Sequence, residues 1–535
     1  MNEHRHALLE SILVFAALAV ATLGLLALSS GLSGVRLAVV LDPIDWLRTL
    51  DAGAAFDALS NAAEVVAGVL GIAITVVAIV LELAANRYSH RITWLFVREP
   101  VNIAVLSFFV LTTLQCVWVA AVLGGSTAQT GENAVIPIAG FAITLSMVTI
   151  SLLALLPYFN FVFAFLSPLN MIEKIRQATL VRITKVRITT LEHTQNAVEE
   201  AVDELQDVAR SAAEQSDRSV AMATVDSMAQ LLEGYDELRD SLPPEWFKIA
   251  PAIAADPDFI SLTPSTLGDI ERSKLWLEVK IFQQYLSLMS QCVPRARDIA
   301  NLIAINTQRI AVGPGRTRPE LRTLCMRCMN SYLRTTINAG DPRTTYYIMN
   351  QYRMLAETML ASGNRDEVME IAGFLKFYGN LGYEVGMPFL LETAAHDLAA
   401  LIEVDLSAED QLVEEILTLL LNLDREIKHE SHEESLLGVR RSQIQLGTLF
   451  LQRGEVKRAG RIAADLATES AERLGGVFDL LEQAREEQYW EFTARGINFA
   501  YLAPERRAQL PHLARMVEEA RTAPDSAEAG KSKRS

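Results

Sequence analysis

Four long apolar runs in the first third of the chain constrain its fold more than any other feature. They lie near residues 8–29, 63–85, 101–123 and 134–157. A helix needs roughly 20 apolar residues to cross the hydrocarbon core of a bilayer. Backbone groups in lipid must be hydrogen-bonded within their own segment, so each run is predicted to be a helix. The sequence therefore predicts a four-helix transmembrane domain over residues 1–170.

Two of these runs allow a second interpretation. The first run follows Arg5 and ends near small residues, as a signal peptide does. Its apolar core is longer than the usual signal-peptide core of about 7 to 15 residues, so we expect a retained span. In the fourth run, Pro157 removes a helix hydrogen bond. We expect a break at Pro157 followed by an aromatic interfacial segment, and the alternative is one long tilted helix.

Lysine and arginine residues in short loops predict the orientation of the spans. The loop between the second and third runs contains Arg87, Arg91 and Arg98, and a further basic group follows the fourth run. The loop between the third and fourth runs contains no basic residue. We therefore expect the N-terminus, the second loop and the long C-terminal part to be cytoplasmic.

Five membrane positions are candidates for function. Glu82 is an acid near the end of the second run, and an acid that faces a bundle interior is often functional. Alternatively, Glu82 lies at the interface and pairs with Arg87. Arg87 and Arg91 are expected to anchor the helix end, with Tyr88 at the level of the lipid headgroups. Gln115 is expected to hydrogen-bond between helices, or alternatively to line a path through the membrane.

The segment VVAIVLELAANRYSHRITWLFVREPVNIAVLSFFVLTTLQ, residues 76–115, resembles the core of a bacterial membrane-protein family named domain of unknown function 2254. The resemblance follows an apolar helix, a turn, an aromatic residue and a basic–acidic pair. The matching residues are Leu83, Ala84, Tyr88, Ser89, Arg91, Phe96, Arg98 and Glu99. Glu82 and His90 depart from it, because the family often has Gln and Pro there.

A second, looser likeness to the same family lies in the C-terminal half. The family's Asn-Asp-Pro-x-Thr-Ala stretch is matched by Asp341, Pro342 and Thr344, which form a candidate cytoplasmic motif. The resemblance implies a multi-pass protein of the bacterial inner membrane with a soluble C-terminal domain. It brings no known activity, so function has to be argued from the residues.

The remainder of the chain reads as helix, which makes the predicted fold class all-α. Residues 171–243 are predicted to form an amphipathic helical stalk, residues 268–520 a helical cytoplasmic domain, and residues 521–535 a disordered tail. Two stretches, LAETMLASGNRDEVMEIAGFL and LGTLFLQRGEVKRAGRIAADL, resemble tetratricopeptide hairpins. They predict either a degenerate α-solenoid or two separate helical hairpins.

Motifs for catalysis or metal binding are weak. Cys325 and Cys328 form a C-x-x-C pair without a second pair at zinc-site spacing, so we expect buried thiols. His429 and His432 near Glu433 are more typical of a solvated helix end than of a metal site. No P-loop, dinucleotide fingerprint or nucleophile elbow occurs. We therefore expect no enzyme activity and no cofactor or metal.

Two functions fit these observations. The first is a membrane-anchored interaction or regulatory protein whose helical cytoplasmic domain binds a partner protein. The alternative is an oligomeric ion channel or small-solute transporter, which would require assembly of several copies. The net charge of −17 argues against broad nucleic-acid binding, which needs a basic surface. The expected partners are the lipid bilayer, a cytoplasmic protein and further copies of the chain.

Overall fold

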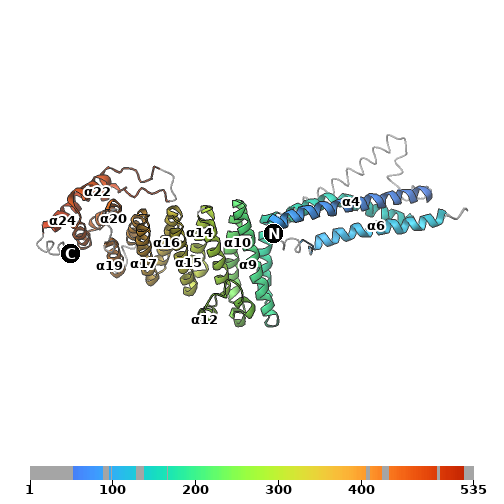
Figure 1. The fold of residues 1–535 in the computed structure, drawn as a ribbon, viewed down its shortest axis with the longest axis horizontal. Coiled ribbons are helices and arrows are strands. Elements are labelled where there is room, and N and C mark those ends of the chain that lie inside the picture. The colour runs from blue at the N-terminus through green and yellow to red at the C-terminus, as the bar shows by residue number, and fades with distance from the viewer. Residues whose placement is uncertain are drawn as a thin grey trace. The chain divides into compact units, whose positions relative to one another are not determined.

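The computed structural model describes residues 52–522 apart from 88–95, 98, 128–137, 166, 294, 405–409, 425–432 and 491–494. The chain divides into two compact units, Met1–Lys174 and Ile175–Ser535. The described residues are helical, as predicted, and contain no β-strand (Figure 1). One isolated antiparallel bridge joins Gln488 and Ile497.

The described part of unit 1 contains three helices that are long and apolar enough to cross a membrane. They are α4 (Ala52–Arg87), α6 (Pro100–Thr127) and α7 (Ile138–Phe165). Helix α4 packs along α6, and both contact α7. Small buried clusters join the three helices, while many of the other apolar side chains are exposed. Candidate membrane helices therefore occupy three of the four predicted runs, and the first, near 8–29, lies outside the described residues.

The predicted break at Pro157 is wrong, and the alternative of one long helix is correct. Helix α7 continues through Pro157 to Phe165, so the predicted limit of the fourth run moves from 157 to 165. A proline inside a helix costs about 3 kcal/mol because one hydrogen bond is lost. Tyr158, Val162 and Phe165 are buried against neighbouring helices, and this packing offsets the loss.

The segment predicted as a stalk contains several helices. These are most of α8 (Pro168–Thr184), then η1 (Ile188–Thr190), α9 (Leu191–Glu214) and α10 (Arg218–Arg239). Helix α9 buries Val198, Val202 and Leu205, the face that its periodicity predicts. It packs against α10 and against α13 (Trp276–Cys292), so it is part of the helical array rather than a separate strut.

The rest of unit 2 continues helix after helix. The elements are η2 (Pro244–Phe247), α11 (Pro251–Ala254), α12 (Pro264–Ser273), α14 (Arg297–Val312), η3 (Pro314–Thr317), α15 (Pro319–Asn338), α16 (Pro342–Ala361), α17 (Arg365–Glu384), α18 (Phe389–Val404), α19 (Asp410–Leu421), α20 (Glu433–Gln452), α21 (Val456–Leu466), α22 (Ala471–Gln483), α23 (Pro504–Arg507) and α24 (Leu510–Thr522).

The long helices of unit 2 form two rows. In one row each helix packs against the next in the order α10, α14, α16, α18 and α20. In the other row the order is α9, α13, α15, α17 and α19. Consecutive helices from α13 to α19 pack across the two rows as well. Figure 1 shows the helices from α9 to α19 side by side in chain order. The core therefore runs as a continuous layer between the rows.

Both predicted helical hairpins are present, and each turns at a glycine in the left-handed region. Gly363, between α16 and α17, has φ +80°, and Gly454, between α20 and α21, has φ +78°. At the first turn the N–H of Gly363 donates to Leu360 (3.0 Å) and that of Asn364 to Met359 (3.0 Å). This pair of bonds is the Schellman motif, which favours glycine at the left-handed position. The tetratricopeptide repeat itself stays a prediction.

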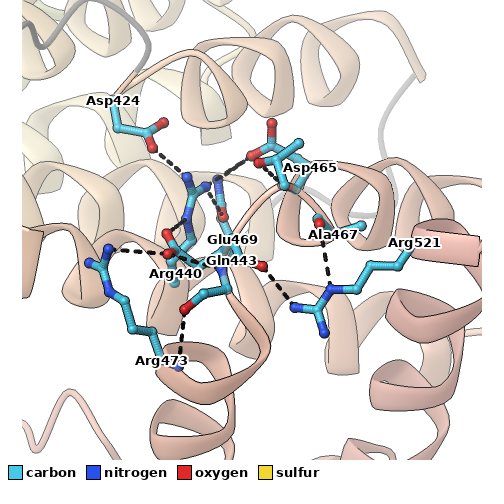
Figure 2. Close-up of polar contacts among 10 residues, drawn as sticks. Asp424, Arg440, Gln443, Asp465, Ala467, Glu469, Arg473 and Arg521 are labelled. Carbon is cyan, nitrogen blue, oxygen red and sulfur yellow. Dashed lines mark hydrogen bonds and ion pairs between the residues drawn. The ribbon is translucent and has the colours of Figure 1, made fainter. Parts of the chain in front are cut away.

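An arginine ties the C-terminal helices together (Figure 2). Arg440 on α20 contacts Asp424 (2.5 Å), Asp465 (3.1 Å) and Glu469 (3.5 Å). Arg521 on α24 donates to the backbone carbonyl of Glu469 at 2.8 Å. The side chains of the three acids are at most 12 % exposed, so these contacts form a largely buried ion-pair network.

Candidate functional site

The predicted membrane positions do not converge on one site. Glu82 is exposed near the end of α4, and Gln115 is half-buried in the middle of α6. Neither side chain makes a hydrogen bond or ion pair with another described residue. The side chain of Arg87, and the whole of Tyr88 and Arg91, lie outside the described residues.

Two other polar pairs join the membrane helices, and sequence reasoning missed both. The hydroxyls of Thr112 on α6 and Ser151 on α7 lie 3.1 Å apart and are buried. The Tyr158 hydroxyl donates to Asn102 Oδ1 at 2.6 Å, and Asn102 Nδ2 donates to the carbonyl of Phe96 at 3.3 Å. Polar side chains of this kind hold membrane helices together. The pairing depends on which helix faces meet, and a single run of sequence does not show that.

Two of the family-like residues hold the segment before α6. The ring of Phe96 packs edge-on against Phe165 at the end of α7, with centroids 5.3 Å apart. Lys174 on α8 lies 4.3 Å from the Phe165 centroid and 3.7 Å from a Glu99 carboxylate oxygen. Phe96 and Glu99 therefore link the start of α6 to the end of α7 and to the first half of α8.

The candidate motif at Asp341, Pro342 and Thr344 is the start of α16. Asp341 is the N-cap: its carboxylate accepts the Thr344 N–H (3.4 Å) and the Thr344 hydroxyl (2.7 Å). Pro342 occupies the first turn, where its missing N–H costs nothing. Arg297 Nε also donates to Asp341 at 2.9 Å. Burial raises the pKa of Asp341, but these bonds outweigh it and leave the pKa below its usual value.

A second charged site, the carboxylate–lysine cluster, was not found from the sequence. It consists of Lys280 on α13, Glu199 and Asp203 on α9, and Asp256 and Asp258 after α11. The Lys280 ammonium is 1 % exposed and lies 2.6 Å from Asp258, 2.8 Å from Asp203, 2.9 Å from Asp256 and 3.5 Å from Glu199. One cation thus faces four carboxylates.

This imbalance of charge controls protonation in the cluster. Burial and a hydrogen bond with Asp256 raise the pKa of Glu199 to about 8, so Glu199 keeps its proton at neutral pH. Burial lowers the pKa of Lys280, but hydrogen bonds to three aspartates outweigh it and raise that pKa above its usual value. Oxygens of Glu199, Asp203 and Asp256 lie within 4.8 Å of one another, a spacing that can hold a cation. Lys280 supplies such a charge.

Another charged cluster joins the middle of α16 and α18 to a segment that follows α22. Asp397 is fully buried and forms an ion pair with Arg495 through both carboxylate oxygens, one of them 3.1 Å from Arg495 Nη2. Arg353 Nε lies 3.4 Å from the same carboxylate. The Arg495 guanidinium lies 4.3 Å from the centroid of the Tyr346 ring and donates to the Tyr346 carbonyl at 3.2 Å. A segment that follows α22 is thereby fastened across two helices of the array.

Aromatic rings cover this ion pair. Phe389 and Phe499 stack at 6.3 Å, Tyr346 lies 5.3 Å from Phe389, and His396 stacks on Phe499 at 4.1 Å. We call these four residues the aromatic patch. Burial, with Arg495 nearby, lowers the pKa of His396 to about 4, so its ring is neutral at physiological pH. Phe389 is 46 % exposed, so an aromatic surface remains open to solvent.

The predicted buried thiols are present. Cys325 and Cys328 are buried in α15 and free. Burial raises the pKa of Cys328 to about 12 and that of Cys325 as well, so neither is a thiolate at neutral pH. His429 and His432 lie outside the described residues.

Comparison with known families supports the membrane assignment reached from α4, α6 and α7. Residues 7–236 match the family model of a predicted membrane protein, DUF2254. The resemblance seen over residues 76–115 is therefore confirmed and extends from the first predicted span into α10. The DUF2254 match ends before α13, so the carboxylate–lysine cluster is only partly inside it and the aromatic patch is outside it. No curated protein matches the chain.

Proposed function

We propose that the chain is a membrane-anchored interaction protein of the bacterial inner membrane. Its spans hold unit 2 at the membrane, and unit 2, a degenerate α-solenoid, binds a partner protein. The observation that carries this proposal is the aromatic patch. Arrays of paired helices commonly bind proteins along their extended faces rather than in deep pockets.

The aromatic patch has the composition of a protein-binding hot spot. Binding energy at interfaces concentrates in aromatic and arginine side chains that are held rigidly and shielded from water. The rings of Tyr346 and Phe389 contact each other. Arg495 packs against Tyr346 and is itself held by its ion pair with Asp397. A rigid aromatic surface loses little conformational entropy on binding. The exposed Val385 lies close to Phe389 in the chain and adds apolar area.

The orientation belongs to the same proposal. Basic residues in the second loop and after the last span support a cytoplasmic N-terminus and a cytoplasmic unit 2. The partner would then be a cytoplasmic protein.

No specific observation favours the channel or transporter alternative. In the described spans, Thr112 pairs with Ser151 and Asn102 with Tyr158, so these polar groups serve helix contacts rather than a water-filled path. Purified protein in liposomes tests this alternative directly. Ion flux above that of empty liposomes, under applied voltage, pH gradient or tension, would replace the interaction proposal.

Site-specific photo-crosslinking in living cells tests partner binding. A photoreactive amino acid replaces Val385 beside the patch, and in a matched control it replaces Val404 at the other end of α18. Both positions are about equally exposed, at 52 % and 56 %. We expect a distinct crosslinked product from Val385 that Val404 does not give and that Phe389→Ser abolishes.

The mass of the product separates the outcomes. A product at twice the mass of the chain indicates self-association at the patch rather than a different partner. If Val385 gives no product, or one that Phe389→Ser leaves unchanged, the patch does not bind a protein and the proposal fails.

A further inference from the structure

A short basic stretch stands out in an acidic chain. The chain has 65 acidic against 48 basic residues, yet residues 174–191 contain no acid at all. The same stretch holds five basic residues: Lys174, Arg176, Arg182, Lys185 and Arg187. The stretch begins nine residues after Phe165, where the last described span ends.

Within unit 2, the second half of α8 has one buried and one exposed side. On the buried side, Leu180 packs directly against Gly234 of α10, where an added Cβ would lie only 2.8 Å from the Leu180 side chain. Ile183 is fully buried as well. Two exposed residues of α8, together with three exposed residues from the segment that follows it up to η1, give three basic and two apolar side chains, which we call the basic–apolar patch. Its members are Val181, Arg182, Lys185, Arg187 and Ile188.

The charges of this patch are not neutralised within the described protein. No ion pair joins Arg182, Lys185 or Arg187 to an acid among the described residues, and Arg182 reaches only the Ala197 carbonyl, at 3.4 Å. The apolar members are strongly exposed, Val181 at 49 % and Ile188 at 69 %. Exposed apolar and basic side chains side by side match a surface that is anionic outside and apolar beneath.

We propose that the basic–apolar patch binds the anionic headgroups of the bilayer in which the chain is anchored. Each lysine or arginine near an anionic membrane contributes roughly 1 kcal/mol, and Val181 and Ile188 can enter the headgroup region. Val181 follows Phe165 by 16 residues, so the chain tethers the patch to the spans and even weak contacts with lipid act at high effective concentration. Unit 2 would thereby contact the membrane directly, in addition to its connection through the chain to the spans.

The test uses the full chain, purified in a mild detergent, with fluorescent phosphatidylglycerol and phosphatidylcholine as probes. We expect the wild type to bind the anionic probe more tightly. The triple variant Arg182→Gln, Lys185→Gln, Arg187→Gln should bind it roughly 100-fold more weakly, since three charges are removed. The preference of the wild type should also fall as salt is raised, because salt screens exposed charges.

A matched control removes the same charge elsewhere. The variant Arg343→Gln, Arg453→Gln, Lys457→Gln changes three exposed basic residues of the array. It should keep the preference for phosphatidylglycerol. Equal thermal unfolding curves for both triple variants show that the loss is not a folding defect. If the variant Arg182→Gln, Lys185→Gln, Arg187→Gln is unfolded, the salt dependence of lipid binding by the wild type still tests the proposal.

Three results would overturn the proposal. The first is a wild type without preference for the anionic lipid, and the second is an equal loss in the control variant. The third is displacement of the lipid probe by millimolar inorganic phosphate or by a short single-stranded DNA. That result would assign the patch to free phosphate or to nucleic acid instead of the bilayer.

Discussion

At the residue scale, the informative features of this chain are charges that lie where water cannot solvate them. Lys280 among four carboxyl groups and Asp397 between two arginines are nearly or fully buried. A buried ion pair contributes modest net stability, but removing one partner leaves an uncompensated buried charge. Substituting one of these charged residues is therefore expected to lower the free energy of unfolding by more than the intact ion pair contributes to it.

The protonation of Glu199 predicts how stability depends on pH. Its pKa is about 8 in the folded protein against an ordinary 4.5, because of burial and the bond with Asp256. Between these values the folded protein binds more protons than the unfolded chain, so stability falls as pH rises. We expect the unfolding temperature of unit 2 to decrease from pH 5 to 8. Glu199→Gln should flatten this slope, whereas Glu214→Gln, at the exposed end of α9, should leave it intact.

Replacing the buried lysine provides a second test of the same cluster. Lys280→Met removes the cation that compensates the three aspartates around it, and we expect a loss of roughly 3–5 kcal/mol in the free energy of unfolding. Thermal unfolding followed by circular dichroism measures it. Lys457→Met, at an exposed position, is the control and should change little. Equal effects of the two variants would mean that the cluster is not a stabilising feature.

At the element scale, the ends of the helices determine how the array is built. Glycine turns separate several of the helices, and capping side chains start others. These signals act over a few residues, so they are legible in the sequence. The hairpins around Gly363 and Gly454 were predicted for this reason, and so was the amphipathic face of α9.

Two described turns depart from the glycine rule, at Ser216 and at Lys274, and Ser216 offers the test. Ser216, between α9 and α10, has φ +61° and is exposed. A side chain in the left-handed region costs about 1 kcal/mol that glycine does not incur. We expect Ser216→Gly to raise the free energy of unfolding by roughly that amount. Ser216→Ala keeps a Cβ at this position and should bring no gain; a gain of the same size from alanine would contradict the argument.

The cap at the start of α16 can be tested by the same logic. Asp341→Ala removes the acceptor for Thr344 and the partner of Arg297, and we expect a loss of roughly 1–2 kcal/mol. Asp341→Asn keeps a good cap and loses only the charge, so it should recover most of the stability. If asparagine is as costly as alanine, the ion pair with Arg297 outweighs the cap.

The sites were harder to predict than the elements, for a physical reason. Lys280 meets Glu199 only because α9 and α13 pack together, and no local pattern states which helices will be neighbours. The motif at Asp341 was visible, but the structure was needed to show that its carboxylate caps a helix. Pro157 illustrates the opposite error, since a local rule predicted a break that the packing of Tyr158 and Val162 overrides.

At the scale of the whole molecule, the chain combines two units with different solvents. Unit 1 exposes apolar surface suited to lipid, and unit 2 buries its apolar surface between two rows of helices. Their stabilities depend on different forces, because helices in lipid associate without the hydrophobic effect that drives folding in water.

Calorimetry of the full chain in detergent should therefore show two unfolding transitions. We expect Lys280→Met to lower the temperature of one transition, that of unit 2, and to leave the other unchanged. Changing the detergent should shift the other transition more strongly. A single transition that moves as a whole in both experiments would show that the two units unfold together.

The two rows of helices also have a mechanical consequence. In a stack where each helix contacts mainly its neighbours, bending is distributed over many small displacements between adjacent helices. Near α16 and α18, Arg495 crosses the stack from a segment far along the chain and acts as a brace. A force pulling on unit 2 would therefore displace α16 and α18 less, relative to each other, than it would without this brace. The aromatic patch beside the brace would keep its geometry under tension.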